Sequence, residues 1–505
     1  MDQRFVKEIK QEISKNDGAD LGYIAYLSAL GLINEVAPSI SRSIVNEIDD
    51  QRSNLKMIAS ENYCSLPVQL AQANLLTDKY AEGFPYHRFY AGCENVDQIE
   101  GEAADLACEL YGADHAYVQP HSGADANLIA YWAILASRIQ DKFVSNKNKK
   151  DISNLSEEEW TELRGILGNQ KLLAMNYYSG GHLTHGYRHN FSSRMFECAS
   201  YDVREDTNLI DYDQVRDKAK SFKPLILLAG YSAYSRKINF RIFKEIADEV
   251  GAVLMVDMAH FSGLVAGKVF EGEFNPVNYA DIVTSTTHKT LRGPRGGMIL
   301  CKNELADSVD KGCPLVIGGP LPHVMAAKAV AFSEANSQSF VDYAHSIVDN
   351  AKVLAETCIE NGLDVLTGGT DNHLLLINVG KLGLTGRMSE KAVRDAGITL
   401  NRNSIPFDPN GAWYTSGLRI GTPATTTLGM GANEMKKIGE VLSDILKSMH
   451  PAKITKGNSV GKPSKANYVL DNDVLNKARG EVKSLLNKYP VYSGVNVDFL
   501  KNIWK

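Results

Sequence analysis

Two charged residues follow predicted buried strands and could together perform amine and acid–base chemistry. Asp257 ends the apolar run Val253–Val256, and Lys289 follows the strand-like run 282–287. In parallel α/β sheets the carboxyl ends of the strands meet at one edge, which is where ligands bind. Each residue also has a simple structural interpretation, because a strand-terminal aspartate can cap the next helix and a strand-terminal lysine can remain solvated.

The residues around Lys289 are not explained by a solvated lysine. Hydroxyl side chains precede it in Thr284–Thr287, and glycines and arginines follow it in Arg292–Gly297. Pyridoxal phosphate requires a lysine amine for its Schiff base and a carboxylate that keeps its pyridine nitrogen protonated. Its phosphate requires hydroxyls, backbone N–H groups and cations. Lys289 and Asp257 meet the first two requirements, so the sequence predicts a pyridoxal-phosphate site.

The elements that must position these residues alternate between strands and helices. Further apolar runs predict strands at 116–118, 171–176, 225–229 and 252–256, and helical patterns predict helices at 101–110 and 242–250. A turn at 120–124 opens another predicted helix. Alternation of this kind predicts an α/β fold with a mostly parallel central sheet flanked by helices.

The chain of 505 residues is long enough for more than one domain. We expect a helical arm at 1–50, a large cofactor-binding domain at 51–339 and a smaller C-terminal α+β domain at 340–505. A long helical pattern at 325–360 leads into this last region, where 374–379 is the clearest strand. Polar segments at 140–169 and 451–465 predict a surface insertion and a linker.

Composition excludes several classes of protein. The net charge of -6, without a basic block, disfavours nucleic acid as a partner. The seven scattered cysteines form no CxxC pair, which disfavours disulfides and zinc and favours a reducing cytoplasm. Residues 1–16 resemble an amphipathic arm and lack the features of a signal peptide. The apolar stretch 21–33 is shorter than the roughly 20 residues that a membrane span needs, so no membrane association is expected.

A metal site is the rival interpretation of one histidine-rich segment. The HxxHxxxH pattern from His182 to His189 could place three imidazoles on one helical face. Gly180, Gly181 and Gly186 instead predict a tight loop, and we expect no metal.

Six segments, in family order, resemble the serine hydroxymethyltransferase family. They are Ile58–Asn62, Lys79–Gly83, Gly180–Gly186, Ser232–Ser235, Thr286–Gly297 and Leu418–Ala424. The resemblance implies a large pyridoxal-phosphate-binding domain and a smaller C-terminal domain, as in aspartate aminotransferase. It implies reversible transfer of the hydroxymethyl carbon of serine to tetrahydrofolate, which gives glycine and 5,10-methylenetetrahydrofolate.

The resemblance also implies roles for individual residues. Lys289 would carry pyridoxal phosphate, Asp257 would pair with its ring nitrogen and His182 would stack on its ring. The other residues implied to bind the cofactor are Ser122 and Gly123 at the phosphate, Ser232 and His260 near the ring hydroxyl, and Thr286. The residues implied to bind substrates are Arg419 and Ser60 at the amino-acid carboxylate, and Leu183 and Asn403 at the folate.

A homodimer with shared active sites is implied as well. Tyr80, Glu82, Tyr90, Gly318 and Gly319 would come from the partner subunit. Glu82 would move protons at the serine hydroxyl and at the folate.

The chain departs from the family pattern at three places. Phe89 and Tyr90 stand where the family has paired tyrosines. Ala124 replaces a usual serine in the phosphate turn, which removes one hydrogen bond worth about 0.5–1.5 kcal/mol. Residues 313–317 replace a phenylalanine and glycines, and we expect this segment, Cys313 included, to touch the folate rim.

Two other functions remain as alternatives. A folate-independent relative, threonine-aldolase-like or alanine-racemase-like, would need Lys289, Asp257 and Arg419 but neither Glu82 nor Asn403. A cofactor-free binding protein on the same scaffold would have no reason to keep these residues together.

Overall fold

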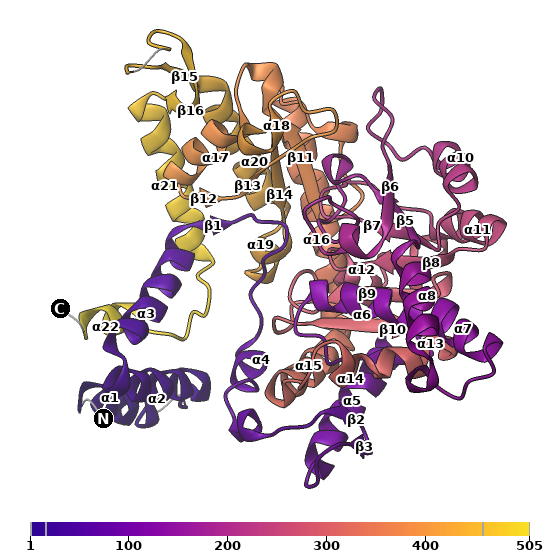
Figure 1. Ribbon diagram of the computed structural model, residues 1–505. Coiled ribbons are helices and arrows are strands. Elements are labelled where there is room, and N and C mark those ends of the chain that lie inside the picture. The colour runs from indigo at the N-terminus through magenta and orange to yellow at the C-terminus, as the bar shows by residue number, and fades with distance from the viewer. Residues whose placement is uncertain (1–2, 16–17, 457–458, 504–505) are drawn as a thin grey trace.

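A seven-stranded sheet forms the centre of the larger domain in the computed structural model, which describes residues 3–15, 18–456 and 459–503 (Figure 1). In order across the sheet, the strands are β4 (His115–Tyr117), β10 (Gly297–Cys301), β9 (Ile282–Thr286), β8 (Val253–Asp257), β7 (Ile226–Gly230), β5 (Lys171–Met175) and β6 (Glu197–Tyr201). Among these strands β10 alone runs antiparallel to its neighbours. The predicted mostly parallel α/β sheet is therefore confirmed.

Both faces of this sheet are buried, which explains why its strands read as continuous apolar runs. Successive side chains of β8 enter different cores: Leu254 packs on one face and Met255 on the other. The first face is covered by α5 (Glu94–Tyr111), α10 (Tyr212–Phe222), α11 (Phe240–Val250) and α15 (Pro322–Ala335). The second is covered by α6 (Gly123–Leu135) and α13 (Asn303–Asp310).

The smaller domain contains a three-stranded antiparallel sheet. Its strands are β11 (Leu374–Asn378), β14 (Gly417–Gly421) and β13 (Asn401–Asn403). The helices that pack in its core are α16 (Gln338–Glu360), α17 (Gly386–Asp395), α20 (Ala432–Ser448) and α21 (Asn472–Lys488). The short strand β1 (Leu55–Lys56) pairs with β12 (Ile398–Thr399), so residues at the start of the predicted large domain belong to the core of the smaller one.

The first fifty residues form a helical arm that packs against the end of the described chain. The arm consists of α1 (Gln3–Ile13), α2 (Leu21–Val36) and α3 (Pro38–Ser53). Its core joins Phe5 and Leu27 to Leu500 of α22 (Val497–Asn502), and Figure 1 shows α22 beside α3 of the arm. The predicted amphipathic segment 1–16 is helical where described, whereas Met1, Asp2 and Asn16 lie outside the described residues. No helix in the described ranges is long and apolar enough to cross a membrane.

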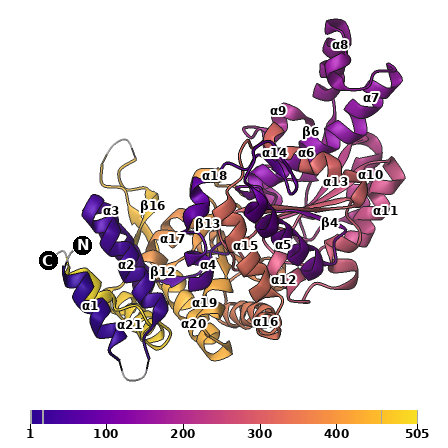
Figure 2. The same cartoon turned by 90° about the horizontal axis from the view of Figure 1, so that it is seen from below.

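The structure adds detail to one predicted segment and differs from the prediction in two others. The insertion 140–169 contains the helices α7 (Asp141–Asn146) and α8 (Glu157–Gly168), which project from the large domain (Figure 2). The predicted linker 451–465 forms most of a hairpin, β15 (His450–Lys453) with β16 (Pro463–Val469), although 457–458 lie outside the described residues. The helical pattern 325–360 is two helices, α15 and α16, because the chain breaks at Asn336 and Ser337 caps the second helix.

The chain also contains several short helices and strands. They are α4 (Leu66–Leu70), β2 (Gly83–Phe84), β3 (His87–Arg88), α9 (Ser192–Met195), α12 (Ser262–Ala266), α14 (Gly312–Leu315), α18 (Gly411–Tyr414) and α19 (Pro423–Thr427).

Candidate active site

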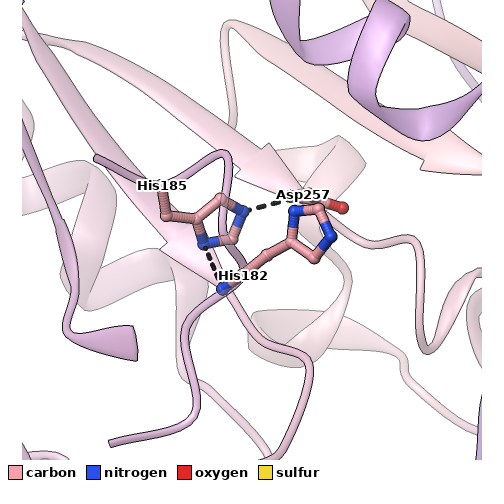
Figure 3. A group of neighbouring side chains, drawn as sticks. All are labelled: His182, His185 and Asp257. Atoms are coloured by element: carbon pink, nitrogen blue, oxygen red, sulfur yellow. Dashed lines mark hydrogen bonds and ion pairs between the residues drawn. The ribbon is translucent and has the colours of Figure 1, made fainter. Parts of the chain in front are cut away.

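Asp257 lies at the carboxyl end of β8, and its carboxylate is almost completely enclosed. Its Oδ2 accepts hydrogen bonds from His185 Nε2 at 3.0 Å and from Asn127 Nδ2 at 2.9 Å (Figure 3). Its Oδ1 accepts from the backbone N–H of Ala259 at 3.0 Å. Burial alone would raise the pKa of Asp257, but the hydrogen bonds from His185 and Asn127 hold this pKa below its ordinary value. Asp257 is therefore a carboxylate that can pair with a protonated ring nitrogen.

The tautomers of the two nearby histidines follow from their partners. His185 Nδ1 accepts from the backbone N–H of His182 at 3.2 Å, so its Nε2 carries the proton that is donated to Asp257 (Figure 3). His182 Nδ1 accepts from the backbone N–H of Thr184 at 3.2 Å. Burial first, and then the neighbouring His185, lowers the pKa of His182 to about 4. His182 is therefore neutral near pH 7 and can lie against a positively charged ring without repulsion.

The histidine segment is a loop, as its glycines predict, and the metal interpretation is wrong about its third member. His189 packs against Tyr187 with ring centroids 5.6 Å apart, away from the other two imidazoles. Instead Asp257 joins His182 and His185, and the potential ligand atoms of these three lie within 4.8 Å of one another. The direct hydrogen bond from His185 to Asp257 accounts for this arrangement without an ion.

Asn127 completes the surroundings of Asp257, and sequence reasoning missed it. Its Nδ2 also donates to Thr184 Oγ1 at 2.7 Å, and its Oδ1 accepts from Thr284 Oγ1 at 2.6 Å. Asn127 lies on α6, a helix whose other residues from Ala126 to Leu135 are apolar. A single amide in such a helix was the signal that could have identified it.

Lys289 lies in the loop after β9, where its side chain is buried. Burial lowers the pKa of its ammonium to about 8; the charge of Asp257 opposes this shift and that of Arg419 adds to it. The backbone is held in place because the carbonyl of Lys289 accepts from Asn62 Nδ2 at 2.9 Å. A buried lysine with a pKa near 8 has a substantial neutral fraction near physiological pH, as a nucleophilic amine requires.

The phosphate turn lies beside β9 at the start of α6. Ser122 is the N-cap of this helix, and its Oγ accepts from the N–H of Asp125 at 3.2 Å. A β carbon at Gly123 would lie 2.7 Å from Thr286 Cγ2, and one at Gly297 would lie 2.3 Å from the carbonyl oxygen of Ser122. Close packing therefore requires both glycines. The structure brings Ser122, Gly123 and Thr286 together at a helix N-terminus, which favours a bound anion.

Three polar side chains lie where the two domains meet at the site. They are Ser232 and His260 of the larger domain and His373 of the smaller one. Ser232 Oγ is buried without a hydrogen-bond partner among the described residues. His260 Nδ1 lies 3.3 Å from His373 Nε2, and the rings stack with centroids 5.5 Å apart. Burial lowers the pKa of both histidines, that of His373 to about 3. An unpaired buried hydroxyl costs about 1–3 kcal/mol, so Ser232 is the kind of group that a polar ligand would satisfy.

Arg419, on strand β14 of the smaller domain, also lies at this site. Its Nε donates to Asn401 Oδ1 at 3.0 Å and its Nη1 to the carbonyl of Ser232 at 2.7 Å. Burial lowers its pKa to about 10, which leaves it cationic near pH 7. A cavity of about 490 Å³ has Arg419, His182, Ser232, Leu183 and Asn403 among its lining residues.

Ser60 directly follows a segment that packs against the end of β14, the strand that carries Arg419. The N–H of Gly421 donates to the carbonyl of Met57 at 2.8 Å, and a β carbon at Gly421 would lie 2.4 Å from Ala59 Cα. Residues 57–60 therefore run against the end of β14.

A second group of predicted residues lies elsewhere on the same chain. Tyr90 packs edge-on against Tyr80, with centroids 5.2 Å apart, and its hydroxyl donates to Glu82 Oε2 at 3.3 Å. The charge of Glu82 raises the pKa of Tyr90. A β carbon at Gly319 would lie 3.5 Å from the Tyr80 ring. Within the described ranges no hydrogen bond joins this group to Lys289, Asp257 or Arg419.

The expectation that Cys313 touches folate is wrong for its thiol. Cys313 is 2% exposed, and its Sγ accepts from the N–H of Gly83 at 3.4 Å and donates to the carbonyl of Gly318 at 2.9 Å. The side chain packs in the core with Tyr117 and Ile129 because the segment turns inward at α14. Leu315, which is 63% exposed, is the surface residue of this segment.

A buried lysine after one parallel strand, a carboxylate ending the next strand and a phosphate turn at a helix N-terminus are typical of pyridoxal-phosphate enzymes. The donor set fits this cofactor, because the amine, the carboxylate and the unpaired hydroxyl of Ser232 converge. The family model for serine hydroxymethyltransferase matches residues 33–147 and 161–442. The chain belongs to the serine hydroxymethyltransferase family.

Three relatives, each named serine hydroxymethyltransferase, illustrate the similarity. The chain is 59% identical to the protein of Treponema pallidum, over 95% of this chain and 83% of that one. It is 55% identical to the protein of Salinispora tropica, over 94% of this chain and 98% of that one. It is 50% identical to the protein of Chlamydia trachomatis serovar D, over 98% and 99% respectively. The family match is interrupted at 148–160, which lies within the helical insertion.

Proposed function

We propose that this protein is a pyridoxal-phosphate-dependent serine hydroxymethyltransferase, which moves the hydroxymethyl carbon of serine to tetrahydrofolate and releases glycine. The observation that carries the proposal is the convergence of Lys289, Asp257 and Arg419 from two domains on one buried site. A reaction of the amino acid alone would need Lys289, Asp257 and Arg419 but would have no use for Leu183 and Asn403. A second substrate, the folate, would use both. Their place on the cavity wall favours folate use over a folate-independent reaction.

The residues of the chain would hold the cofactor in a defined orientation. Lys289 would bind it through its amine, Asp257 would hold the proton on the ring nitrogen, and His182 would lie on the ring face. Ser232 and His260 would face the ring hydroxyl. When bound, pyridoxal phosphate supplies an electron sink for the pair released as a bond to the α carbon of the amino acid breaks.

The other residues would bind the substrates and move protons. Arg419, with Ser60, would bind the carboxylate of serine, since a guanidinium can make two parallel hydrogen bonds to it. Glu82 would accept the proton of the serine hydroxyl as the bond between the α and β carbons breaks. Leu183 and Asn403 would position the folate that receives the β carbon.

A homodimer with shared active sites would bring the second group of residues to the first. No hydrogen bond among the described residues joins Lys289 to Tyr80, Glu82, Tyr90, Gly318 or Gly319 within one subunit, so we infer that a partner subunit would supply them. Large apolar side chains near them support such an interface: Leu75 is 76% exposed, Tyr86 76% and Phe89 70%. Exposed patches of this kind usually mark an interaction surface.

The domain limits and the location of the protein also belong to this proposal. We propose an arm at 1–50, a large domain at 51–339 and a small domain at 340–505. Two exceptions cross these limits: Leu55 and Met57 pack in the core of the small domain, and α16 contributes to both domain cores. We place the enzyme in the cytoplasm, which agrees with seven cysteines that are all free.

An absorbance titration tests the proposed activity. The purified enzyme with bound cofactor is mixed with glycine and then with glycine plus tetrahydrofolate. We expect glycine to change the cofactor spectrum and folate to change it further. A spectrum that responds to glycine but not to folate would refute the transferase and favour the folate-independent alternative.

A further inference from the structure

One buried polar cluster links the backbone around Glu82 to the phosphate turn at Ser122. It consists of Arg88, Asp97, Glu100, Tyr117 and Gln119, which we call the Gln119 cluster. Gln119 is 1% exposed and Glu100 is 2% exposed. Arg88 donates from Nε to Asp97 at 2.8 Å and from Nη2 to Glu100 at 2.6 Å. The buried charges are therefore paired and hydrogen-bonded.

The first side of the cluster holds the backbone around Glu82. Arg88 Nη1 donates to the carbonyl of Ala81 at 3.0 Å and to that of Gly83 at 3.1 Å. Gln119 Nε2 donates to the same carbonyl of Gly83 at 2.8 Å. The two peptide carbonyls that flank Glu82 are thus fixed from inside the protein, while Tyr80 and Tyr90 beside it remain exposed.

The second side of the cluster is continuous with the phosphate turn. Gln119 lies three residues before Ser122. The carbonyls on either side of Gln119 accept from Lys328 Nζ, that of Val118 at 2.5 Å and that of Pro120 at 3.0 Å. The same Nζ donates at 2.8 Å to the carbonyl of Gly297, which packs against Ser122.

Lys328 supports this backbone as a charged group. Burial lowers the pKa of Lys328 to about 7, but its three carbonyl acceptors favour the ammonium form, which alone has three N–H donors. A bound phosphate at the turn nearby would favour the same form.

The amide of Gln119 has little freedom to move. Its Nε2 donates to Gly83 and also to Glu100 Oε1 at 2.7 Å, and its Oε1 accepts from the hydroxyl of Tyr117 at 3.0 Å. Both N–H groups and the carbonyl oxygen are used. A shift of the backbone at Gln119 must therefore move the Glu82 segment or break these bonds.

We propose that Gln119 is a positioning residue that couples cofactor binding in one subunit to the placement of Glu82 in the active site of its partner. The inference depends on the proposed function, in which Glu82 serves the partner subunit. Cofactor bound at the phosphate turn of one subunit would then stabilise the Glu82 segment of the same subunit, and this segment completes the active site of the partner subunit.

Hybrid dimers separate the two sides of this coupling. One subunit carries Lys289→Ala and the other carries Glu82→Gln, so the single working site combines Lys289 of the second subunit with Glu82 of the first. Gln119→Met is then placed in the first subunit, which donates Glu82 but has a silent site of its own. Gln119→Met removes three hydrogen bonds, of which the one to Gly83 holds the Glu82 segment. We expect kcat to fall about tenfold with KM for serine nearly unchanged, the size expected for the loss of that one buried hydrogen bond.

A matched control tests whether any buried amide would have this effect. Asn350→Leu in the same subunit removes two buried hydrogen bonds of an amide, to Thr426 and Met430 in the smaller domain, and should leave kcat unchanged. Gln119→Asn, whose amide is too short to reach both partners, gives a second variant with the same expected pattern.

Amide hydrogen exchange provides a readout without turnover. In the unmixed dimers, exchange in residues 79–92 should slow when pyridoxal phosphate is added to the unaltered protein. In Gln119→Met this segment should exchange about tenfold faster and respond less to the cofactor. An active hybrid in which Gln119→Met changes neither kcat nor exchange would overturn the inference alone. An inactive unaltered hybrid would overturn the shared site and the inference with it.

Discussion

Replacement of Asp257 by asparagine tests the electrostatic centre of the proposed site. The carboxylate receives three hydrogen bonds, from His185, Asn127 and the backbone of Ala259. An amide has only one acceptor oxygen. Whichever way it is turned, its NH₂ group faces at least one of these donors, and it cannot compensate a charged ring nitrogen.

The expected size of the effect follows from these contacts. A charge-assisted hydrogen bond contributes about 1.5–3 kcal/mol, and each 1.4 kcal/mol is tenfold in affinity. We therefore expect Asp257→Asn to bind pyridoxal phosphate about tenfold to about a hundredfold more weakly. Turnover should fall further, because a ring nitrogen that is not held protonated is a poorer electron sink.

Titration of the cofactor-free protein, followed by its absorbance, measures the affinity, and saturating cofactor isolates the loss in kcat. Asp281→Asn is a matched control, because Asp281 precedes β9 at the end remote from Lys289 and accepts from the N–H of Leu254 at 2.8 Å. This control should bind cofactor normally. If Asp257→Asn kept normal affinity and near-normal kcat, Asp257 would not be the partner of the ring nitrogen.

Three other predictions follow from the same geometry. Arg419→Lys should weaken glycine binding about tenfold in a spectroscopic titration while cofactor affinity stays unchanged, because two parallel hydrogen bonds become one point charge; an equal loss of both affinities would contradict the assignment. The rate at which the cofactor-free protein attaches pyridoxal phosphate should rise with pH, with a midpoint near 8, because the neutral amine of Lys289 is the reactive form; a flat profile between about pH 6 and about pH 9 would exclude Lys289 as the titrating group. His373 takes up a proton near pH 6.5 when unfolded but only near 3 when folded, so its stabilising effect is present above pH 6.5 and is lost as the pH falls. The melting temperature should therefore drop between about pH 7 and about pH 5, and His373→Gln should make that drop smaller; an unchanged slope would show that His373 is not responsible.

The parts of the site that could be predicted from the sequence are those with local signals. Asp257 ends an apolar run, Lys289 follows a strand-like run rich in hydroxyls, and Ser122 precedes a helix, so their places in the fold follow from short-range patterns. The helix α8 also had such a signal, since Ser156 and Glu159 form a capping box. The polar composition around it predicted only a surface insertion.

The remainder depended on contacts between distant residues. Asn127 reaches Asp257 across 130 positions of sequence, and His260 meets His373 across 113. Nothing near either residue indicates such a partner, because the sheet and the smaller domain bring them together. The inward turn of Cys313 was unpredictable for the same reason, since its partners Gly83 and Tyr117 come from other elements.

The packing of the arm against α22 has a consequence for synthesis of the chain. Phe5, Leu27 and Val45 share a core with Val497 and Leu500, which a ribosome adds more than four hundred residues later. Domains generally fold as they emerge, beginning at the N-terminus. Here the helices made first must keep their apolar faces uncovered, or covered by a chaperone, until both domains have been translated. A stalled or truncated product lacking residues 495–503 would therefore expose its arm and be the species most prone to aggregate.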